Sequence, residues 1–414
     1  MTEKSAKPQL RFAGFDDTWE QRKLSEVATM HARIGWQNLR TSEFLDSGDY
    51  MLITGTDFND GVINYSTCHF VERERYEQDK HIQIKNGSIL ITKDGTLGKV
   101  AYVQGLSMPA TLNAGVFNVE IKDETEVDNK YLFQYLKAPF LMNYVDKKAT
   151  GGTIKHLNQN ILVDFPVLMP SKAEQEAIGV YFERLDNLIT LHQRKYDKLT
   201  NVKKSMLEKM FPKNGSNVPE IRFKGFSDAW EQRKVGELLI ERNEQAPMSE
   251  EYPLMAFIAN EGVAPKGERY DRSSLVTDTE NKLYKRTEFG DFIYSSNNLE
   301  TGSIGLNKYG KACISPVYSI FQPTGIADSD FLGRRLVRKD FINSMVKWRQ
   351  GVIYGQWRIH ESDFLKIEIP VPSVEEQKQI GTFLDYLDNL ITLHQRELEK
   401  LKNLKKACLE KMFV

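Results

Sequence analysis

Two long stretches of the chain place apolar residues at alternating steps of three and four, the spacing of an amphipathic helix. They cover residues 171–211 and 373–413, contain no proline, and have one glycine each, Gly179 and Gly381, near the start. A heptad pattern sustained over this length predicts a coiled coil rather than a helix lying on a globular core. At 1.5 Å per residue each helix would be roughly 60 Å long.

The predicted seam between these helices is mostly aliphatic. It comprises Leu185, Ile189, His192, Leu199, Leu387, Ile391, His394 and Leu401. Polar side chains interrupt it at His192 and Lys203, and again at the equivalent His394 and Lys405. Such residues fix the register of a coiled coil at some cost in stability. A sharper hypothesis is that His192 and His394 meet on a pseudo-two-fold axis; no third ligand accompanies them, so no metal site is expected.

Each predicted helix opens with the same short motif. Ser171 and Ser373 follow a proline and precede a glutamate by three residues, at Glu174 and Glu376. This is the capping-box pattern, in which the serine and the glutamate each satisfy a backbone amide of the first turn.

The chain consists of two copies of one module, an internal sequence repeat. Residues 10–27, LRFAGFDDTWEQRKLSEV, match residues 221–238, IRFKGFSDAWEQRKVGEL, at 11 of 18 positions. LDNLITLHQR occurs without change at 185–194 and 387–396. Between these matched ends the two copies diverge, so a constant frame carries two variable inserts. Divergent inserts on one frame indicate two related domains with separate specificities.

Connectivity predicts that the two helices are antiparallel. A short loop after Phe211 leads directly into the second insert, whereas a parallel pair would require a bridge of ~60 Å. Pro8 matches Pro219, so the N-terminal peptide is expected to dock where the second helix ends.

The inserts are predicted to be mixed α+β domains. Residues 88–103 read as two strands joined by a glycine-bearing turn, and residues 291–306 are the counterpart, with a turn longer by about four residues. Within these turns residues 94–98 resemble residues 301–305. YLFQYLKAPFLMNYVDKKA, in the first insert, is predicted to be helical.

Polar and cationic loops occur at matching places in the two inserts, at residues 150–160 and 349–360. Their side chains can read base edges, and glycines permit close approach to phosphates, although an ordinary polar turn has the same composition. The candidate DNA-binding residues are Lys93, Thr96, Lys99, Thr153, Lys155, His156, Asn297, Asn298, Ser303, Arg349, Gln356 and Arg358.

The composition and the missing motifs disfavour several classes of protein but do not identify a function. The net charge of −1 does not itself support DNA binding, because phosphate neutralisation usually requires a basic surplus. There is no apolar run long enough for a membrane span and no secretory leader. Cys68, Cys313 and Cys408 lie far apart and are expected to be reduced, as in a cytoplasmic protein. No P-loop, dinucleotide fingerprint, methyltransferase tetrapeptide, nucleophile elbow or zinc-protease motif is found, so no catalytic residue is expected.

The repeated motifs closely resemble the specificity subunits of type I restriction-modification systems over essentially the whole chain. The resemblance implies an α+β fold with a pseudo-two-fold repeat: target-recognition domains at 1–170 and 213–372, and antiparallel coiled-coil helices at 171–212 and 373–414. It implies that each domain reads one half of a split site on double-stranded DNA, and that the helices set the spacer. It also implies two methyltransferase subunits and restriction subunits as partners, which would carry S-adenosylmethionine and ATP with magnesium.

Two other functions remain open from the residues alone. The inserts could bind proteins, with the helices forming a dimer interface, and a gel-shift assay would distinguish this scaffold from a DNA reader. A standalone enzyme is the third class, which the missing catalytic motifs disfavour.

Overall fold

The computed structural model describes residues 7–148, 156–213, 215–265, 282–353 and 356–413. The chain forms two compact units. The first contains Met1–Arg194 and Gln395–Val414, and the second contains Lys195–His394. Each unit therefore combines one insert with the beginning of one long helix and the end of the other.

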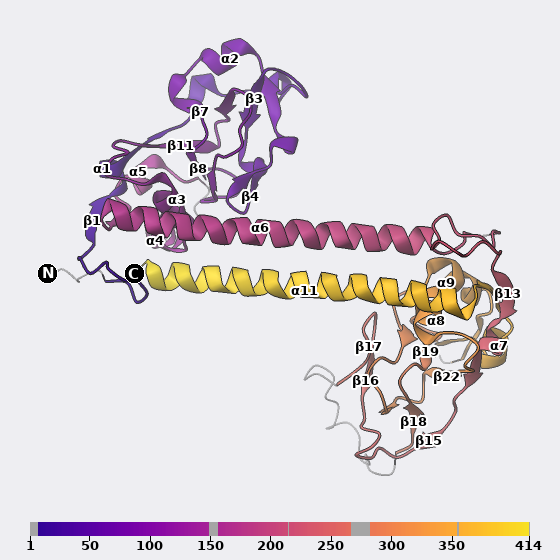
Figure 1. The fold of residues 1–414 in the computed structure, drawn as a ribbon. Helices are drawn as coiled ribbons and strands as arrows, with labels where there is room; N and C mark the ends of the chain where they lie inside the picture. Colours follow the sequence, from indigo (N-terminus) through magenta and orange to yellow (C-terminus); the bar gives the residue numbers. More distant parts are fainter. Residues whose placement is uncertain (1–6, 149–155, 214, 266–281, 354–355, 414) are drawn as a thin grey trace. The chain divides into compact units, whose positions relative to one another are not determined.

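The two long helices are α6 (Lys172–Lys209) and α11 (Val374–Met412), which confirms the helices predicted from the heptad pattern. In each unit the start of one helix lies beside the end of the other (Figure 1). In the first unit Phe182 of α6 stacks on Phe413, just beyond α11, with ring centroids 5.7 Å apart. In the second, Leu384 of α11 shares a core with Met206 of α6. The helices are thus antiparallel, as the connectivity predicted.

The peptide before each insert docks on the end of a long helix. Leu10 N donates to the carbonyl of Lys411 at 3.0 Å, and Ile221 N donates to the carbonyl of Lys209 at 3.0 Å. The expectation that the N-terminal peptide docks where the second helix ends is therefore confirmed, and the second copy repeats it.

Most predicted seam positions are buried or packed against a core. Leu185, Ile189 and Leu387 are buried, while Leu199 and Leu401 pack against the cores of their units. Ile391, His192 and His394 are half-buried. His192 belongs to the first unit and His394 to the second, so the meeting of their imidazoles stays a prediction.

The polar seam lysines form ion pairs across the helices. Lys405 Nζ lies 2.6 Å from Asp186 Oδ1, and Lys203 pairs with Asp388 at the equivalent place in the second unit. Both members of each pair are offset by 202 residues from their counterparts, so the duplication preserved the whole contact.

The first insert contains two four-stranded sheets, with strand orders β2-β11-β8-β9 and β6-β3-β10-β7. A further pair, β1 with β12, places Glu20 opposite Met169 and so closes the insert onto the start of α6. The strands are β1 Glu20–Lys23, β2 Ala28–His31, β3 Tyr50–Ile53, β4 Phe58–Asn59, β5 Val62–Ile63, β6 His69–Val71, β7 Gln83–Ile84, β8 Ile89–Thr92, β9 Val100–Tyr102, β10 Ala110–Leu112, β11 Val116–Ile121 and β12 Pro166–Met169. The helices are α1 Leu24–Val27, α2 Arg73–Glu77, α3 Asn129–Lys137, α4 Phe140–Lys148 and α5 Gln159–Leu162.

The second insert repeats part of this plan. The order β14-β22-β19-β20 corresponds to β2-β11-β8-β9, and β13 pairs with β25 as β1 pairs with β12. Its strands are β13 Glu231–Lys234, β14 Leu239–Glu241, β15 Gln245–Ala246, β16 Ala256–Ile258, β17 Gly262–Ala264, β18 Tyr284–Thr287, β19 Phe292–Tyr294, β20 Ile304–Leu306, β21 Ala312–Ile314, β22 Ser319–Pro323, β23 Gln350–Ile353, β24 Gln356–Arg358 and β25 Glu368–Val371. Its helices are α7 Val235–Leu238, α8 Ser329–Leu336, α9 Lys339–Val346 and α10 Glu361–Phe364.

The glutamates of the predicted capping boxes act differently from the prediction. Ser373 Oγ does accept from Glu376 N at 3.3 Å. The buried carboxylate of Glu174 instead accepts two hydrogen bonds from Arg11, and that of Glu376 accepts two from Arg222. The capping-box prediction is therefore wrong for the glutamates, because a guanidinium from the preceding peptide takes the place of the backbone amide.

The next residue of each motif, a buried glutamine, joins the long helix to its insert. Gln175 Oε1 accepts from Asp128 N at 2.9 Å, and Gln377 Oε1 accepts from Asp328 N at 2.8 Å. Asp128 and Asp328 in turn cap α3 and α8. At Gly179 a Cβ would lie 2.8 Å from Asp128 Oδ1, so glycine permits this close approach. The frame residues thus fix where each insert sits on its helix.

No helix in the described part of the chain is long and apolar enough to cross a membrane. Cys68, Cys313 and Cys408 are buried free thiols, which agrees with the reduced state expected from their spacing.

Candidate nucleic-acid interface

Each insert carries a β-hairpin whose loop contains candidate DNA-binding residues. In the first insert β8 and β9 pair up to Ile91 and Val100, which leaves residues 92–99 in the loop. In the second, β19 and β20 pair up to Tyr294 and Ile304, which leaves residues 295–303. Two strands with a glycine-bearing turn were predicted in both places, and both are present.

The predicted alignment of the two loops was wrong. The second loop is one residue longer, nine residues (295–303) against eight (92–99), rather than longer by about four. Gly98 and Gly302 each lie two residues before the second strand, with φ of 70° and 96°. Gly302 therefore corresponds to Gly98, whereas the sequence match had aligned it with Gly95. The left-handed backbone that both turns require explains why glycine recurs there.

The loop of the first hairpin is shaped by a buried threonine. Thr92 Oγ1 accepts from Lys99 N at 2.9 Å and donates to the carbonyl of Thr96. Thr96 and Lys99 are exposed at the tip. Lys93 is half-buried, with Nζ 5.4 Å from the centre of the Phe117 ring. The fold thus presents two cations and a hydroxyl on one loop.

The second predicted loop of this insert lies against the hairpin. Leu157 N donates to the carbonyl of Lys93 at 2.8 Å, and His156 Nδ1 lies 2.5 Å from Asp94 Oδ1. His156 remains 70 % exposed. Lys93, Thr96, Lys99 and His156 are therefore brought together, while Thr153 and Lys155 lie outside the described residues.

The second insert brings its two loops together in the same way. Arg349 makes two hydrogen bonds to the carboxylate of Glu300, at 3.0 and 2.8 Å, and Ile359 N donates to Ser296 Oγ at 3.1 Å. Arg358 is exposed, with its guanidinium 3.9 Å from Glu361.

The remaining candidates of the second insert differ in accessibility. Asn298 is exposed and Asn297 half-buried, whereas Ser303 is only 8 % exposed. Gln356 lies in β24, but its side chain is outside the described part of the chain. Asn298 and Arg358 are thus the candidates of this insert that the fold presents most openly.

The carboxylates that join the loops were not predicted from the sequence. Asp94 contacts His156 in the first insert, and Glu300 contacts Arg349 in the second. A carboxylate on the hairpin faces a nitrogen-bearing side chain on the second loop in both inserts, and this pairing was the available signal. Arg349, whose side chain is 12 % exposed, is thereby bound to the hairpin loop. Its role toward DNA stays a prediction.

The chemistry of both surfaces is that of a polar binding face. Lysine, arginine and asparagine donors stand on paired loops, and cationic and amide donors suit phosphates and base edges.

Comparison with known proteins identifies the family of the chain. A family model described as "Type I restriction modification DNA specificity domain" matches the chain twice, over residues 16–201 and 227–403. The chain belongs to this family. The two matches coincide with the two copies of the internal repeat, so each copy is one DNA specificity domain.

Relatives of similar length support the assignment. The chain is 24 % identical to the MjaX specificity subunit of a type I restriction enzyme of Methanocaldococcus jannaschii, over 94 % of this chain and 91 % of the relative. It is also 24 % identical to the MjaVIII specificity subunit of that organism, over 79 % and 78 % of the two chains. The crystal structure of a type I restriction-modification S subunit from M. genitalium shares the fold, with a TM-score of 0.63, 16 % identity, and 98 % and 99 % of the two chains covered.

Proposed function

We propose that this DNA specificity protein is the recognition subunit of a type I restriction-modification complex, in which each insert reads one half of a bipartite site. The observation that carries the proposal is that two specificity domains occupy one chain. They share a frame but present different side chains on equivalent loops, Lys99 and His156 in one against Asn298 and Arg358 in the other. Different donors on equivalent surfaces give each insert its own base preference.

The constant frame is proposed to dock two methyltransferase subunits. LDNLITLHQR is identical in both helices, yet several of its apolar side chains are exposed in their units: Leu188 is 44 %, Leu191 46 % and Leu393 51 % exposed. Leu191 and Leu393 occupy the same position of the two segments, and core packing does not account for leucines exposed at equivalent positions, whereas a partner that binds each copy does. Two identical segments support two such subunits per chain.

Catalysis is assigned to the partners. We propose that S-adenosylmethionine is bound by the methyltransferase subunits and that ATP with magnesium is bound by restriction subunits, so this chain supplies specificity and carries neither of these cofactors. The buried, unpaired cysteines agree with a cytoplasmic setting.

Methylome sequencing of a host strain with and without this gene tests the proposal. The expected result is one bipartite methylation motif that disappears with the gene. A motif that persists unchanged in the deletion strain would contradict the role in recognition.

The scaffold alternative has its own test. A gel-shift assay with a duplex carrying the motif should show a specific complex in the presence of the methyltransferase partners. If the assembled complex binds that duplex no better than a scrambled one, the inserts are protein-binding modules instead.

A further inference from the structure

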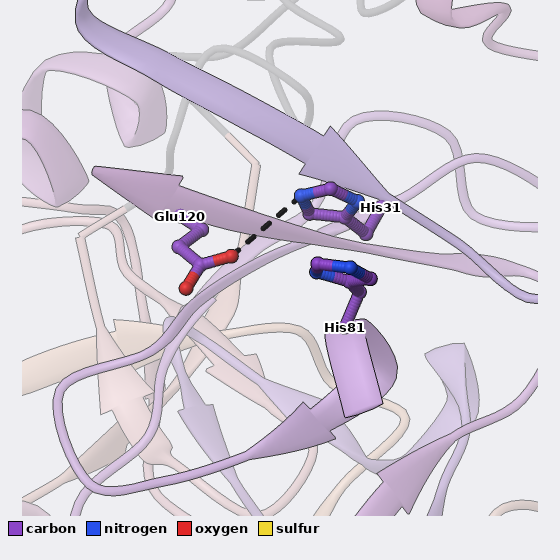
Figure 2. A group of neighbouring side chains, drawn as sticks. All are labelled: His31, His81 and Glu120. Atoms are coloured by element: carbon purple, nitrogen blue, oxygen red, sulfur yellow. Dashed lines mark ion pairs between the residues drawn. The ribbon is translucent and has the colours of Figure 1, made fainter. Parts of the chain in front are cut away.

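Three side chains with metal-binding atoms meet on the first insert. His31 ends β2, Glu120 lies in β11, and His81 lies in the 3-10 turn Lys80–Ile82 that leads into β7. Nε2 of His31 is 3.6 Å from Glu120 Oε2 (Figure 2). The two imidazoles stack with centroids 4.4 Å apart. One donor atom from each residue lies within 4.8 Å of the other two.

Strand pairing places two of these residues on one face. Thr29 is opposite Glu120 in the β2–β11 pair, and His31 is two residues further along the same strand. Because alternate residues of a strand share a face, His31 and Glu120 project to the same side. The arrangement follows from register and needs no unusual backbone.

The backbone of His81 is fixed from two directions. The Asp79 side chain accepts from His81 N at 2.9 Å, and Asn118 Nδ2 donates to the His81 carbonyl at 3.0 Å. Asn118 is the residue opposite His31 in the strand pair. The third ligand is thus tied to the same strands that carry the other two.

We propose that His31, His81 and Glu120 bind one divalent transition-metal ion of the zinc class. Two imidazoles and a carboxylate form a donor set that zinc accepts, with a water completing the tetrahedron. Calcium and magnesium prefer all-oxygen ligands, so the imidazoles disfavour them. Ligand atoms on a tetrahedral zinc are about 3.3 Å apart, given bonds of about 2.0–2.1 Å. The His31–Glu120 separation is close to this value. The exposed His81 ring stacks on His31, so it must rotate out of that stack for its ring nitrogen to point at the same ion.

Binding costs His31 one existing contact. Its Nε2 lies 3.0 Å from Thr29 Oγ1, a contact that coordination of the metal replaces. Thr29 keeps a second partner, since its hydroxyl also donates to the Glu120 carbonyl at 3.4 Å. The exchange therefore leaves no buried group without a partner.

The ion would join the two sheets of the insert. His31 and Glu120 belong to the sheet β2-β11-β8-β9, while His81 lies two residues before β7 of the sheet β6-β3-β10-β7. A metal ion shared by ligands from both sheets stabilises their packing, because a site formed only in the folded state adds its binding free energy to folding.

The second insert does not repeat the site. At the offset of 211 residues Arg242 stands in place of His31 and pairs with Asp291, with Nε 2.9 Å from Oδ2. A guanidinium has no lone pair to offer a metal. Among the described residues this is the one cluster of three such ligands, so the expected stoichiometry is one ion per chain.

Calorimetric titration of the full chain with zinc chloride, after removal of metal with EDTA, tests the site. We expect one equivalent to bind with micromolar or tighter affinity. His81→Gln should weaken binding by more than the roughly 10- to 100-fold that loss of a supporting partner costs. His69→Gln is the matched control, since His69 lies in the same insert and contacts Phe44, outside the cluster. Equal binding by wild type and His81→Gln, or no binding by wild type, would overturn the proposal.

Thermal unfolding provides a second readout. Zinc should raise the Tm of wild type and of His69→Gln, and should leave His81→Gln and Glu120→Gln unchanged. All four proteins should unfold at similar temperatures in EDTA, because the substituted side chains are half-exposed or exposed. A zinc-dependent rise of the same size in both cluster variants would show that the metal binds elsewhere.

Discussion

Arg11 and Glu174, 163 residues apart in sequence, are joined by two hydrogen bonds of 2.7 and 2.8 Å. The glutamate is fully buried, and Trp19 Nε1 also donates to it at 3.1 Å. Arg222 and Glu376 repeat the pair in the second unit, with the same two distances. The docking peptide, which precedes each insert and contains Arg11 or Arg222, is thus bound to the long helix that follows the same insert.

Removing one partner of this pair should destabilise the corresponding unit. Glu376→Gln leaves Arg222 facing a neutral amide in a mostly buried site, and we expect a loss of about 3 kcal/mol in the free energy of unfolding. Denaturant unfolding of the full chain measures it. Glu77→Gln is the control, because its partner Arg73 is on the surface, and no measurable change is expected there. Equal stability of Glu376→Gln and wild type would show that the pair adds nothing.

Sequence alone predicted the frame because the frame is local and repeated. Heptad spacing predicted α6 and α11, the short connection after Phe211 predicted their direction, and the matched ends predicted the docking of the peptide at Leu10. The partners of Glu174 and Gln175 could not be predicted in this way. Their contacts reach Arg11 and Asp128, and a capping box read from four neighbouring residues contains no information about such distant groups.

The candidate interface was predicted less completely. Glycine and strand patterns located both hairpins, but pairing register decided that Gly98, and not Gly95, corresponds to Gly302. The burial of Ser303 and the pairing of Arg349 with Glu300 depend on tertiary packing. The cluster of His31, His81 and Glu120 likewise arises from the contact of two sheets, and no spacing of these residues along the chain predicts it.

Lys405 predicts a pH dependence of stability. Burial lowers its pKa to about 8, below the roughly 10.4 of a solvated lysine, although Asp186 acts in the opposite direction. The nearby charge of Lys137 also lowers the pKa of Lys405, and that of Asp60 raises it. Between these two pH values the unfolded chain binds more protons than the folded one, so stability rises with pH by up to about 1.4 kcal/mol per unit.

The comparison with Lys405 variants isolates this effect. Lys405→Met and Lys405→Arg carry no group that loses a proton at that position between pH 7 and 10. Wild type should therefore gain stability relative to both variants as the pH rises from 8 to 10, measured by denaturant unfolding at each pH. A difference between wild type and variants that stays flat over this range would contradict the buried, weakly basic lysine.

Substitutions in the hairpin loops should act on one half-site each. Lys99→Ala is expected to change only the half read by the first insert, and Asn298→Ala only the other half, because each side chain is exposed on its own unit. The affected half should lose discrimination by roughly 10- to 100-fold. Methylome sequencing of strains carrying each variant reports both halves at once.

A matched surface substitution shows whether the effect is local. Lys224→Ala removes the same charge as Lys99→Ala, but from the exposed docking peptide of the frame. It should leave both half-sites unchanged. If Lys99→Ala and Lys224→Ala relax the motif alike, the hairpin loop does not read bases.

The coiled coil should set the distance between the half-sites. One heptad inserted after Arg194 and another after His394 falls at the division between the two units in both helices, so each unit keeps its own contacts. Seven residues lengthen a helix by about 10 Å, or about three base pairs, and preserve the heptad register. The methylated motif should therefore retain both half-sites and gain about three base pairs of spacer. Insertion of seven residues in α6 alone serves as the control, since it leaves α11 too short to pair and should abolish methylation. Altered half-sites in the doubly extended protein would contradict the role of the coiled coil as a spacer, because helix length alone cannot change which bases a loop reads.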